Sequence, residues 1–205
     1  MRKAQTQAIS LVLISAIVIT LVGFAYAWGK PIIDKRSTIT MFASSIRFME
    51  DLDRKIVDMA GTCSFEGACE ESLDLPVPGI IRLDESGNKI IYEYEVNQPL
   101  IDPHGEVFFN TADNGSYARY GETPGVISLK GEEVALGSYM LKFSVRYREL
   151  DSDEPWRGYI IQLLKSGGES GNNKILVSYG GSETRSGEAR EGRDLVVSKI
   201  KVLPM

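Results

Sequence analysis

The sequence predicts an α+β fold in which one long N-terminal helix packs on an antiparallel β-sheet or β-sandwich domain. Apolar residues dominate the chain from residue 8 to residue 28 and then recur every three or four positions up to Met59, which is helical spacing. After Cys69 the pattern changes to short apolar runs separated by glycine, asparagine, aspartate and proline, which is typical of strands and turns. A chain of 205 residues has room for one substantial core with appendages.

Charge and residue content argue against several classes of function. The net charge is -5 and the pI is about 5.1, whereas nucleic-acid binding needs a basic surface. The lone His104 stands in a proline- and glycine-flanked turn, and residues 137–139 lack the Gly-x-Ser-x-Gly frame of a nucleophile elbow. The acidic run 151–154 lacks the spacing of a calcium loop, so we expect a solvated loop, with a divalent cation as the alternative. We therefore expect no nucleic acid, metal, cofactor or enzymatic activity.

The N-terminal apolar segment is long enough to cross a membrane. Residues 8–28 are free of charge, and at 1.5 Å per residue this helix covers a hydrocarbon core of about 30 Å. It is too long for the apolar part of an ordinary secretory signal, so we expect it to be retained. Tyr26, Trp28 and Lys30 suit a membrane interface at its end. We assign residues 5–30 to a transmembrane or assembly helix.

The orientation of this segment is set by features on both of its sides. Positive charges stand before it at Arg2 and Lys3 and after it at Lys30, Lys35 and Arg36, so they are nearly balanced. The short head favours an N-terminus in the cytoplasm, and a cysteine pair and a glycosylation sequon at Asn114 suit a domain outside it. We expect the C-terminal domain outside the cytoplasm; the alternative is a cytoplasmic domain on an inverted anchor.

Residues 31–61 continue the helix in amphipathic form. One apolar stripe consists of Ile39, Phe42, Ile46, Met49, Leu52, Ile56 and Met59. Most charged residues, which are Arg47, Glu50, Asp51, Asp53, Arg54, Lys55 and Asp58, are expected on the other faces. We expect the stripe from Phe42 to Met59 to pack on the sheet rather than to form a coiled coil, Pro31 to bend or interrupt the helix, and the helix to end near Gly61.

The extracytoplasmic β-rich domain is assigned to residues 62–205. The expected strands are 79–83, 89–96, 106–109, 126–130, 138–149, 158–165, 174–179 and 194–203. Residues 85–88 predict a hairpin turn, and residues 167–173 predict a longer loop. In 140–148 the alternation places Leu141, Phe143, Val145 and Tyr147 on the core face, and Met140, Lys142, Ser144, Arg146 and Arg148 on the solvated face. Residues 180–193 lack large apolar side chains and are expected to form a mobile surface loop.

The two cysteines, Cys63 and Cys69, are close in the sequence and predict a single disulfide bond. With only the distant His104 to add, they fall short of the four ligands of a structural zinc site. Two free thiols are the alternative. A disulfide bond implies an oxidising compartment, which agrees with a domain outside the cytoplasm.

The order of these parts resembles the archaeal type IV pilins and archaellins, which carry class III signal peptides. The resemblance covers about sixty residues: the basic head Arg2-Lys3, then Ala4-Gln5, the apolar stretch and its amphipathic extension. It implies that a prepilin-type signal peptidase removes a leader of residues 1–4 by cutting between Ala4 and Gln5, with cleavage between Ala8 and Ile9 as the alternative. Ile9 stands where many bacterial-type pilins have a glutamate at the fifth mature position.

A helix that is apolar on every side is soluble only in lipid or in a bundle of its own kind. The assembly residues are expected to be Ile9, Leu11, Leu13, Ile17, Val18, Leu21 and Phe24, with small residues between them that permit close helix approach. The first hypothesis is a filament subunit for adhesion, surface attachment or motility, whose partners are membrane lipid, copies of itself or other pilin-like subunits. The alternative is a membrane-anchored binding module or filament-machinery component that does not polymerise. An anchored hydrolase is disfavoured because catalytic groups are missing.

Overall fold

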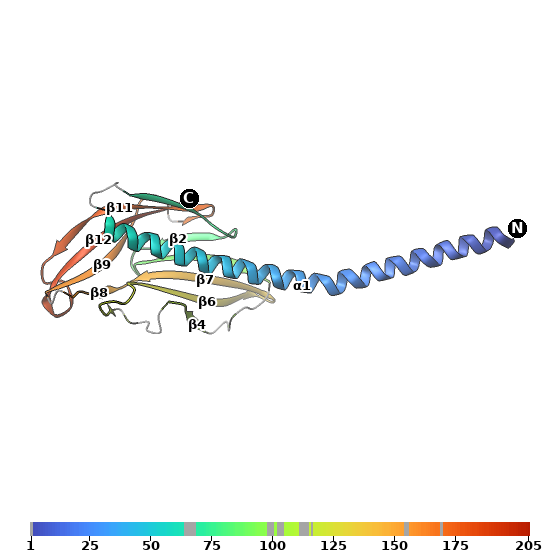
Figure 1. Ribbon diagram of the computed structural model, residues 1–205, viewed down its shortest axis with the longest axis horizontal. Helices are drawn as coiled ribbons and strands as arrows, with labels where there is room; N and C mark the ends of the chain where they lie inside the picture. Colours follow the sequence, from blue (N-terminus) through green and yellow to red (C-terminus); the bar gives the residue numbers. More distant parts are fainter. Residues whose placement is uncertain are drawn as a thin grey trace. The chain divides into compact units, whose positions relative to one another are not determined.

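The computed structural model has an α+β fold: within the described residues, one long helix and two six-stranded sheets, as the sequence predicts (Figure 1). The structure describes residues 2–63, 69–97, 101, 105–110, 115, 117–153, 156–168 and 170–205, with side chains from residue 12 onward. Residues up to Thr40 form one compact unit, and residues from Met41 onward form another.

Helix α1 extends over Arg2–Thr62 and ends where the sequence predicts. Of the two expected effects of Pro31, a bend or an interruption, the interruption is wrong, because Pro31 lies inside the continuous helix. A proline removes one backbone hydrogen bond and costs about 3 kcal/mol in a helix interior. Helix propagation is favourable once nucleated, and α1 has many intact turns on both sides of Pro31 that offset this local loss.

One sheet contains antiparallel pairs throughout its described strands. Its order is β10 (Ser170–Gly171), β2 (Ile80–Asp84), β3 (Lys89–Val96), β7 (Ser138–Tyr147), β6 (Gly125–Ala135) and β4 (Glu106–Phe108). Strand β7 follows the predicted alternation, since Leu141, Phe143, Val145 and Tyr147 are all buried. This sheet therefore turns one apolar face towards the core.

The other sheet is mainly antiparallel, as expected, but it also contains two parallel pairs. Its order is β1 (Glu70–Asp74), β11 (Lys174–Arg185), β12 (Asp194–Pro204), β9 (Arg157–Lys165), β8 (Glu149–Asp151) and β5 (Tyr117–Ala118). Strand β12 is parallel to β9, and β5 is parallel to β8. After β9 the chain contributes β10 to the first sheet before it returns as β11. Strand β12 then lies between β11 and β9, antiparallel to β11 and parallel to β9.

The main core lies between these sheets and residues 41–62 of α1. Phe42 contacts the rings of Phe109 and Phe143, with ring centroids 6.5 and 6.0 Å apart. Phe48 packs edge-on against Tyr92 at 5.5 Å. Aromatic pairs in these orientations add to the stabilisation from apolar burial alone. The helix and the sheets therefore share one apolar core.

The turn between β2 and β3 connects the two sheets through Asn88. This residue has a φ of 47°, a left-handed conformation that asparagine tolerates better than most residues. Its side-chain amide donates to the carbonyls of Tyr147 in β7 and Ile161 in β9, at 3.1 and 2.7 Å. Its side-chain oxygen accepts from the amide of Leu163 at 2.9 Å. The predicted hairpin is thus confirmed, and its last turn residue joins strands of both sheets.

The expectation of a mobile loop over residues 180–193 is wrong. Strand β11 extends to Arg185, and its residues 182–185 pair with residues 195–198 of β12. A short 3-10 turn, η1 (Arg190–Gly192), follows, and the neighbouring Ala189 is buried against Leu195 and Val197. Backbone pairing needs no large side chains, and Leu195 and Val197 supply the apolar contacts that the segment itself lacks.

Several short strands escape the sequence prediction. Strand β10 lies in the segment assigned to a loop, β1 and β5 lie outside the expected strands, and β6 continues to Ala135 rather than ending at Lys130. The expected strand 138–149 divides at Arg148 into β7 and β8, which belong to different sheets. Arg148 is also buried rather than solvated, because the change of sheet takes it out of the alternation of β7.

Candidate functional site

The exposed apolar surface of α1 is the first candidate for a functional site. Every large apolar side chain from Val12 to Trp28 is more than half exposed, and Trp28 is 78% exposed. Water disfavours such a surface, whereas lipid or a bundle of apolar helices accepts it. Within the described residues, α1 is the helix that is long and apolar enough to cross a membrane.

Polar and small residues in this segment are compatible with an apolar environment. The Thr20 hydroxyl donates to the Ala16 carbonyl at 2.8 Å, so its polar group is satisfied within the helix. No described atom lies within 4 Å of a Cβ built on Gly23. Near the end of the segment, the Lys30 ammonium lies 6.0 Å from the Tyr26 ring centre. Another helix could approach closely at Gly23, and Tyr26 with Lys30 suits a polar boundary.

The predicted residues of this segment are only partly described. Leu13, Ile17, Val18, Leu21 and Phe24 are exposed by 51–74%. Backbone at Ala4, Gln5, Ile9 and Leu11 is helical, but the side chains of these four lie outside the described residues. The processing site therefore remains a prediction.

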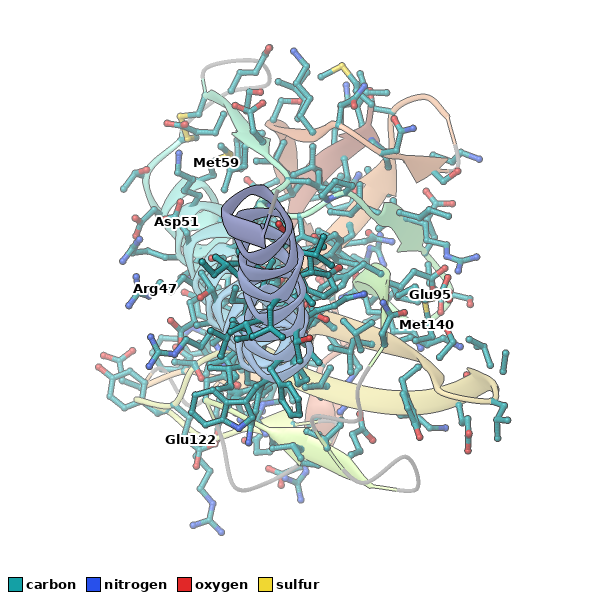
Figure 2. All side chains as sticks on the ribbon, turned by 90° about the vertical axis from the view of Figure 1, so that its right-hand side faces the viewer. Arg47, Asp51, Met59, Glu95, Glu122 and Met140 are labelled. Atoms are coloured by element: carbon teal, nitrogen blue, oxygen red, sulfur yellow. A yellow bond between two sulfur atoms is a disulfide. The ribbon has the colours of Figure 1, made fainter. Side chains whose placement is uncertain are left out.

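The predicted packing residues of α1 lie on one side of the helix. Met49, Leu52 and Ile56 are completely buried, Met59 is 4% exposed, and Phe42 and Ile46 are partly buried against the core. Arg47 and Asp51 point away from the sheets (Figure 2). The buried face is wider than the predicted stripe, since it also contains Phe48 and Ser45. The Ser45 hydroxyl is satisfied by the Met41 carbonyl at 2.9 Å, which lets a polar residue occupy the core.

Asp53 departs from the predicted solvated face of α1. It stands four residues after Met49 and three before Ile56, so helical spacing turns it towards the sheet. The Asp53 Oδ1 and Tyr147 hydroxyl are buried without a hydrogen-bond partner among the described residues. Burial raises the pKa of Asp53 to about 6, while interaction with the Tyr147 hydroxyl lowers it by less. Burial and the nearby Asp53 charge raise the pKa of Tyr147 well above its ordinary value.

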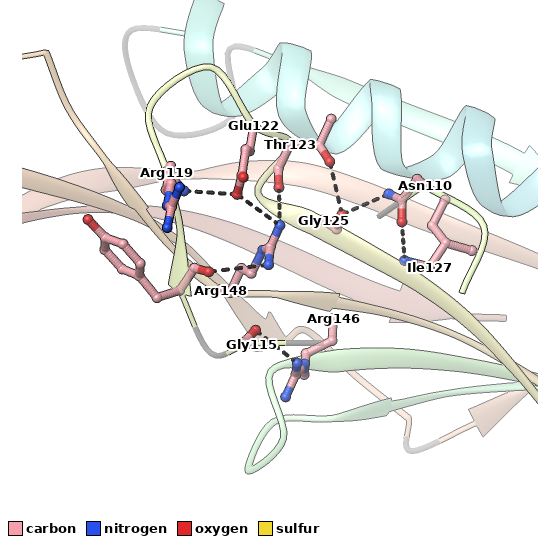
Figure 3. Close-up of polar contacts among 10 residues, drawn as sticks. Asn110, Gly115, Arg119, Glu122, Thr123, Gly125, Ile127, Arg146 and Arg148 are labelled. Atoms are coloured by element: carbon pink, nitrogen blue, oxygen red, sulfur yellow. Dashed lines mark hydrogen bonds and ion pairs between the residues drawn. The ribbon is translucent and has the colours of Figure 1, made fainter. Parts of the chain in front are cut away.

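Gly125 is the residue of β6 that faces this carboxylate. A Cβ at Gly125 would collide with the Asp53 side chain, so glycine permits the close approach of helix and strand. The Gly125 carbonyl accepts from the Asn110 side-chain amide at 2.7 Å, and the Asn110 side-chain oxygen accepts from the Ile127 amide at 2.8 Å (Figure 3). This part of β6 is therefore fixed from both sides.

Arg148 anchors the segment 117–124 from beneath (Figure 3). Its side chain is 1% exposed and lies 3.6 Å from the Glu122 carboxylate. It donates to the carbonyls of Tyr117 and Thr123 at 3.2 and 3.4 Å. A buried arginine is tolerated when carbonyls and a carboxylate satisfy it in this way. Arg148 therefore positions the backbone of this segment. The alternation of residues 140–148 assigned Arg148 to the solvated face and gave no sign of this burial.

A surface cavity of about 890 Å³ lies beside Arg148. It is lined by Gly115, Tyr117, Arg119, Glu122, Glu149, Glu188, Ala189 and Arg190. Glu149 accepts from the Arg190 amide at 2.9 Å, and Glu188 lies 3.6 Å from Arg185. The Arg190 guanidinium lies 4.7 Å from the Tyr117 ring centre and covers one face of it. These groups engage one another, so the cavity has the character of a solvated surface hollow.

The remaining predicted sites have different outcomes. A disulfide bond joins Cys63 and Cys69, with Cα atoms 6.2 Å apart. His104 and the sequon residue Asn114 lie outside the described residues. In the acidic run, Asp151 pairs with Arg193 at 2.5 Å, and Glu154 is outside the described residues. Among the described side chains, no cluster of three or more His, Cys, Asp or Glu is suited to a metal ion.

Together these features define an α+β protein whose N-terminal helix combines a membrane-compatible apolar segment with a segment that is packed in a β core. Comparison of the chain with protein-family models, characterised proteins and solved structures finds no match.

Proposed function

We propose that this chain is a structural subunit of an extracellular filament, similar to the archaeal type IV pilins and archaellins, that polymerises through its N-terminal apolar helix. The supporting observation is the exposure of every large apolar side chain from Val12 to Trp28. A surface that is apolar all round the helix suits lipid before assembly and neighbouring helices after it. The same helix can exchange one environment for the other without unfolding, because its backbone hydrogen bonds are internal.

In this proposal a prepilin-type signal peptidase cuts between Ala4 and Gln5 and leaves residues 5–30 as the start of the mature subunit. The β-rich domain then lies outside the cytoplasm and forms the outer layer of the filament. The disulfide bond between Cys63 and Cys69 fits an oxidising location. The filament would serve adhesion, surface attachment or motility.

The test is the N-terminus of the mature protein together with electron microscopy of cells that make the full-length chain. Mass spectrometry of the surface-exposed form is expected to find an N-terminus at Gln5, and microscopy is expected to find filaments that disappear when the gene is deleted. A double variant, Arg2→Ala with Lys3→Ala, is expected to keep its leader and to form no filaments. The matched control is Lys30→Ala with Lys35→Ala, which removes the same charge after the apolar segment and is expected to be processed normally.

A surface form that keeps Arg2 and Lys3 and makes no filaments would overturn the proposal. That result identifies the alternative, a membrane-anchored binding module or filament-machinery component that does not polymerise. A native protein that lacks residues 9–28 would exclude both.

A further inference from the structure

The hairpin between β6 and β7 ends in an exposed apolar tip, which we define as residues 134–137. Leu136 is fully exposed at 102%, and Val134 is 50% exposed. The turn is completed by Gly137, whose φ is 76°. Polar residues usually occupy such a tight turn, and the fold does not bury this leucine. Its side chain is therefore available to a surface outside the β-rich unit.

The tip lies at the end of the β-rich unit where the chain enters it. Phe42 contacts Phe143, with ring centroids 6.0 Å apart, and Asp53 lies beside Tyr147. Residues 42–53 span about 16 Å as a helix, and residues 143–147 span about 13 Å as a strand. Since these spans are similar, β7 runs alongside this part of α1 and in the same direction. The tip precedes β7 and therefore lies beyond the Phe42 end (Figure 1).

The hairpin at the opposite end of the β-rich unit has a polar turn. The Ser198 hydroxyl of β12 donates to the Ala60 carbonyl at 3.4 Å, which places this part of β12 beside the last turns of α1. Residues 182–185 of β11 continue the pairing beyond Ser198. The turn that follows begins with Ser186, Gly187 and Glu188, which are all exposed. It lies away from the β6–β7 hairpin (Figure 1).

A short helical stretch separates the apolar segment from the β-rich unit. Residues 29–40 lie between Trp28 and Met41, and α1 is continuous through them. As a helix this stretch spans about 18 Å. The strand from Leu136 to Phe143 spans up to about 23 Å. A membrane that holds the apolar segment is therefore within the reach of the tip.

The charges around the tip select the kind of lipid. Glu133 is exposed next to the apolar residues, and the Glu95 carboxylate accepts a hydrogen bond from the Ser138 hydroxyl. Glu132 is paired with Lys142 at 2.5 Å. The tip therefore has an acidic rim, which an anionic lipid surface repels and a zwitterionic surface accepts.

We propose that the tip of the unassembled protein inserts Leu136 and Val134 into the surface of a zwitterionic lipid membrane. The inference rests on the membrane-spanning role of the apolar segment, which is part of the proposed function, and it does not need polymerisation. Moving one leucine side chain from water to lipid favours the inserted state by roughly tenfold or more. Because the anchor already holds the tip near the membrane, this preference is enough to keep the tip inserted. Two attachment points then fix the orientation of the β-rich unit before assembly.

The test places a fluorescent probe beside the tip of the full-length protein. Ala135→Cys puts a thiol at an exposed position next to the intact Leu136, and the native cysteines are joined in a disulfide bond. The thiol is labelled with a nitrobenzoxadiazole dye, and the protein is reconstituted in phosphatidylcholine vesicles with ordinary or brominated acyl chains. Bromine quenches a dye that lies in the lipid. The emission is expected to be lower by roughly twofold in brominated vesicles.

Two matched variants control for the position of the dye and for the leucine. Ser186→Cys carries the dye in the exposed turn at the opposite end and is expected to emit equally in both kinds of vesicle. Adding Leu136→Asp to Ala135→Cys changes a fully exposed side chain, so the fold is kept, and it is expected to abolish the quenching. Phosphatidylglycerol in the vesicles is expected to weaken the quenching, and Glu133→Gln is expected to restore part of it.

The outcomes separate this inference from the proposed function. Equal emission from position 135 in both kinds of vesicle, with the protein still membrane-bound, overturns the insertion and leaves the filament function standing. Quenching that survives Leu136→Asp also overturns the insertion. A dye at position 135 that is blue-shifted but not quenched is covered by protein, such as a second copy, and the proposal is then wrong.

Two further results concern both proposals. If the vesicles do not retain the full-length protein, the membrane role of the apolar segment fails, and the insertion and the filament function are overturned together. If position 135 is quenched but cells that make the chain form no filaments, the insertion is supported and the filament function is overturned.

Discussion

The side-chain oxygen of Asn88 accepts a hydrogen bond from the backbone amide of Leu163 at 2.9 Å. Asn88 belongs to the β2–β3 turn of one sheet, and Leu163 belongs to β9 of the other. With the bonds to the carbonyls of Tyr147 and Ile161, the Asn88 side chain makes three hydrogen bonds to backbone groups of both sheets. Asn88 therefore connects the two sheets where their strands diverge.

Replacing Asn88 is expected to destabilise the β domain. Asn88→Ala removes all three side-chain hydrogen bonds and leaves an alanine at positive φ, where no hydrogen bond offsets the backbone strain. The free energy of unfolding is therefore expected to fall by about 3 kcal/mol. Asn88→Gly relieves the backbone strain and is expected to lose less. Urea unfolding of the full-length protein in detergent measures both. The exposed Ser86→Ala in the same turn is the control, and equal stability of Asn88→Ala and Ser86→Ala would refute the role of Asn88.

Asp53 is expected to make stability depend on pH. Burial raises the pKa of Asp53 to about 6, above its ordinary value of 3.8, so the folded state binds the proton more tightly than the unfolded state. The stabilisation is full below pH 3.8, and it is lost as the pH rises through 6. One pKa unit corresponds to about 1.4 kcal/mol, so the change over this window is about 3 kcal/mol at most.

The variant Asp53→Asn is expected to lose this pH dependence and to be more stable than the parent protein at pH 7. The exposed Asp58→Asn on the same helix is the control and is expected to keep the parent profile. Unfolding free energies measured between pH 4 and pH 7 decide the matter. If the free energy of unfolding changes equally with pH in Asp53→Asn and in the parent protein, the Asp53 carboxylate is not the cause of the pH dependence.

The disulfide bond between Cys63 and Cys69 is expected to contribute about 2 kcal/mol, because it closes a short loop in the unfolded chain. The double variant Cys63→Ser with Cys69→Ser is expected to unfold at lower denaturant concentration by this amount. A reducing agent should shift the parent protein in the same way and leave the double variant unchanged. A reductant effect on the double variant would mean that another process is being observed.

Val18 lies near the middle of the apolar segment and is 51% exposed. A charged side chain in the centre of a membrane helix costs about 2.5 to 3.5 kcal/mol, so Val18→Asp is expected to lower the membrane-bound fraction tenfold or more. Extraction of membranes with alkaline carbonate measures this fraction. The control is Ser37→Asp, an exposed position after the apolar segment that is expected to stay membrane-bound. Retention of Val18→Asp at the parent level would argue against a membrane role for this segment.

Periodicity predicted the helix, its end and most long strands, because core packing imposes a repeat that the sequence must follow. Met49, Leu52 and Ile56 show this most clearly, since their spacing and their burial agree. The parallel pairing of β12 with β9 was beyond such reasoning, because strand order depends on contacts between distant parts of the chain. Arg148 was missed because alternation does not reveal where the chain passes from one sheet to the other. Asp53 was missed because its charge was given more weight than its helical spacing from Met49 and Ile56, which places it on the buried side.

The position of the disulfide bond has a kinetic consequence. Cys63 and Cys69 flank the passage from α1 to β1, and β1 pairs with β11, whose residue Ser178 lies more than a hundred positions after its partner Glu70. Closing so long a loop is entropically slow, whereas six-residue closure is fast. Once the disulfide bond has formed, it holds β1 close to the end of α1, whether or not β1 has yet paired with β11. The bond thus keeps β1, one partner in the most distant strand pairing of this sheet, close to the end of α1.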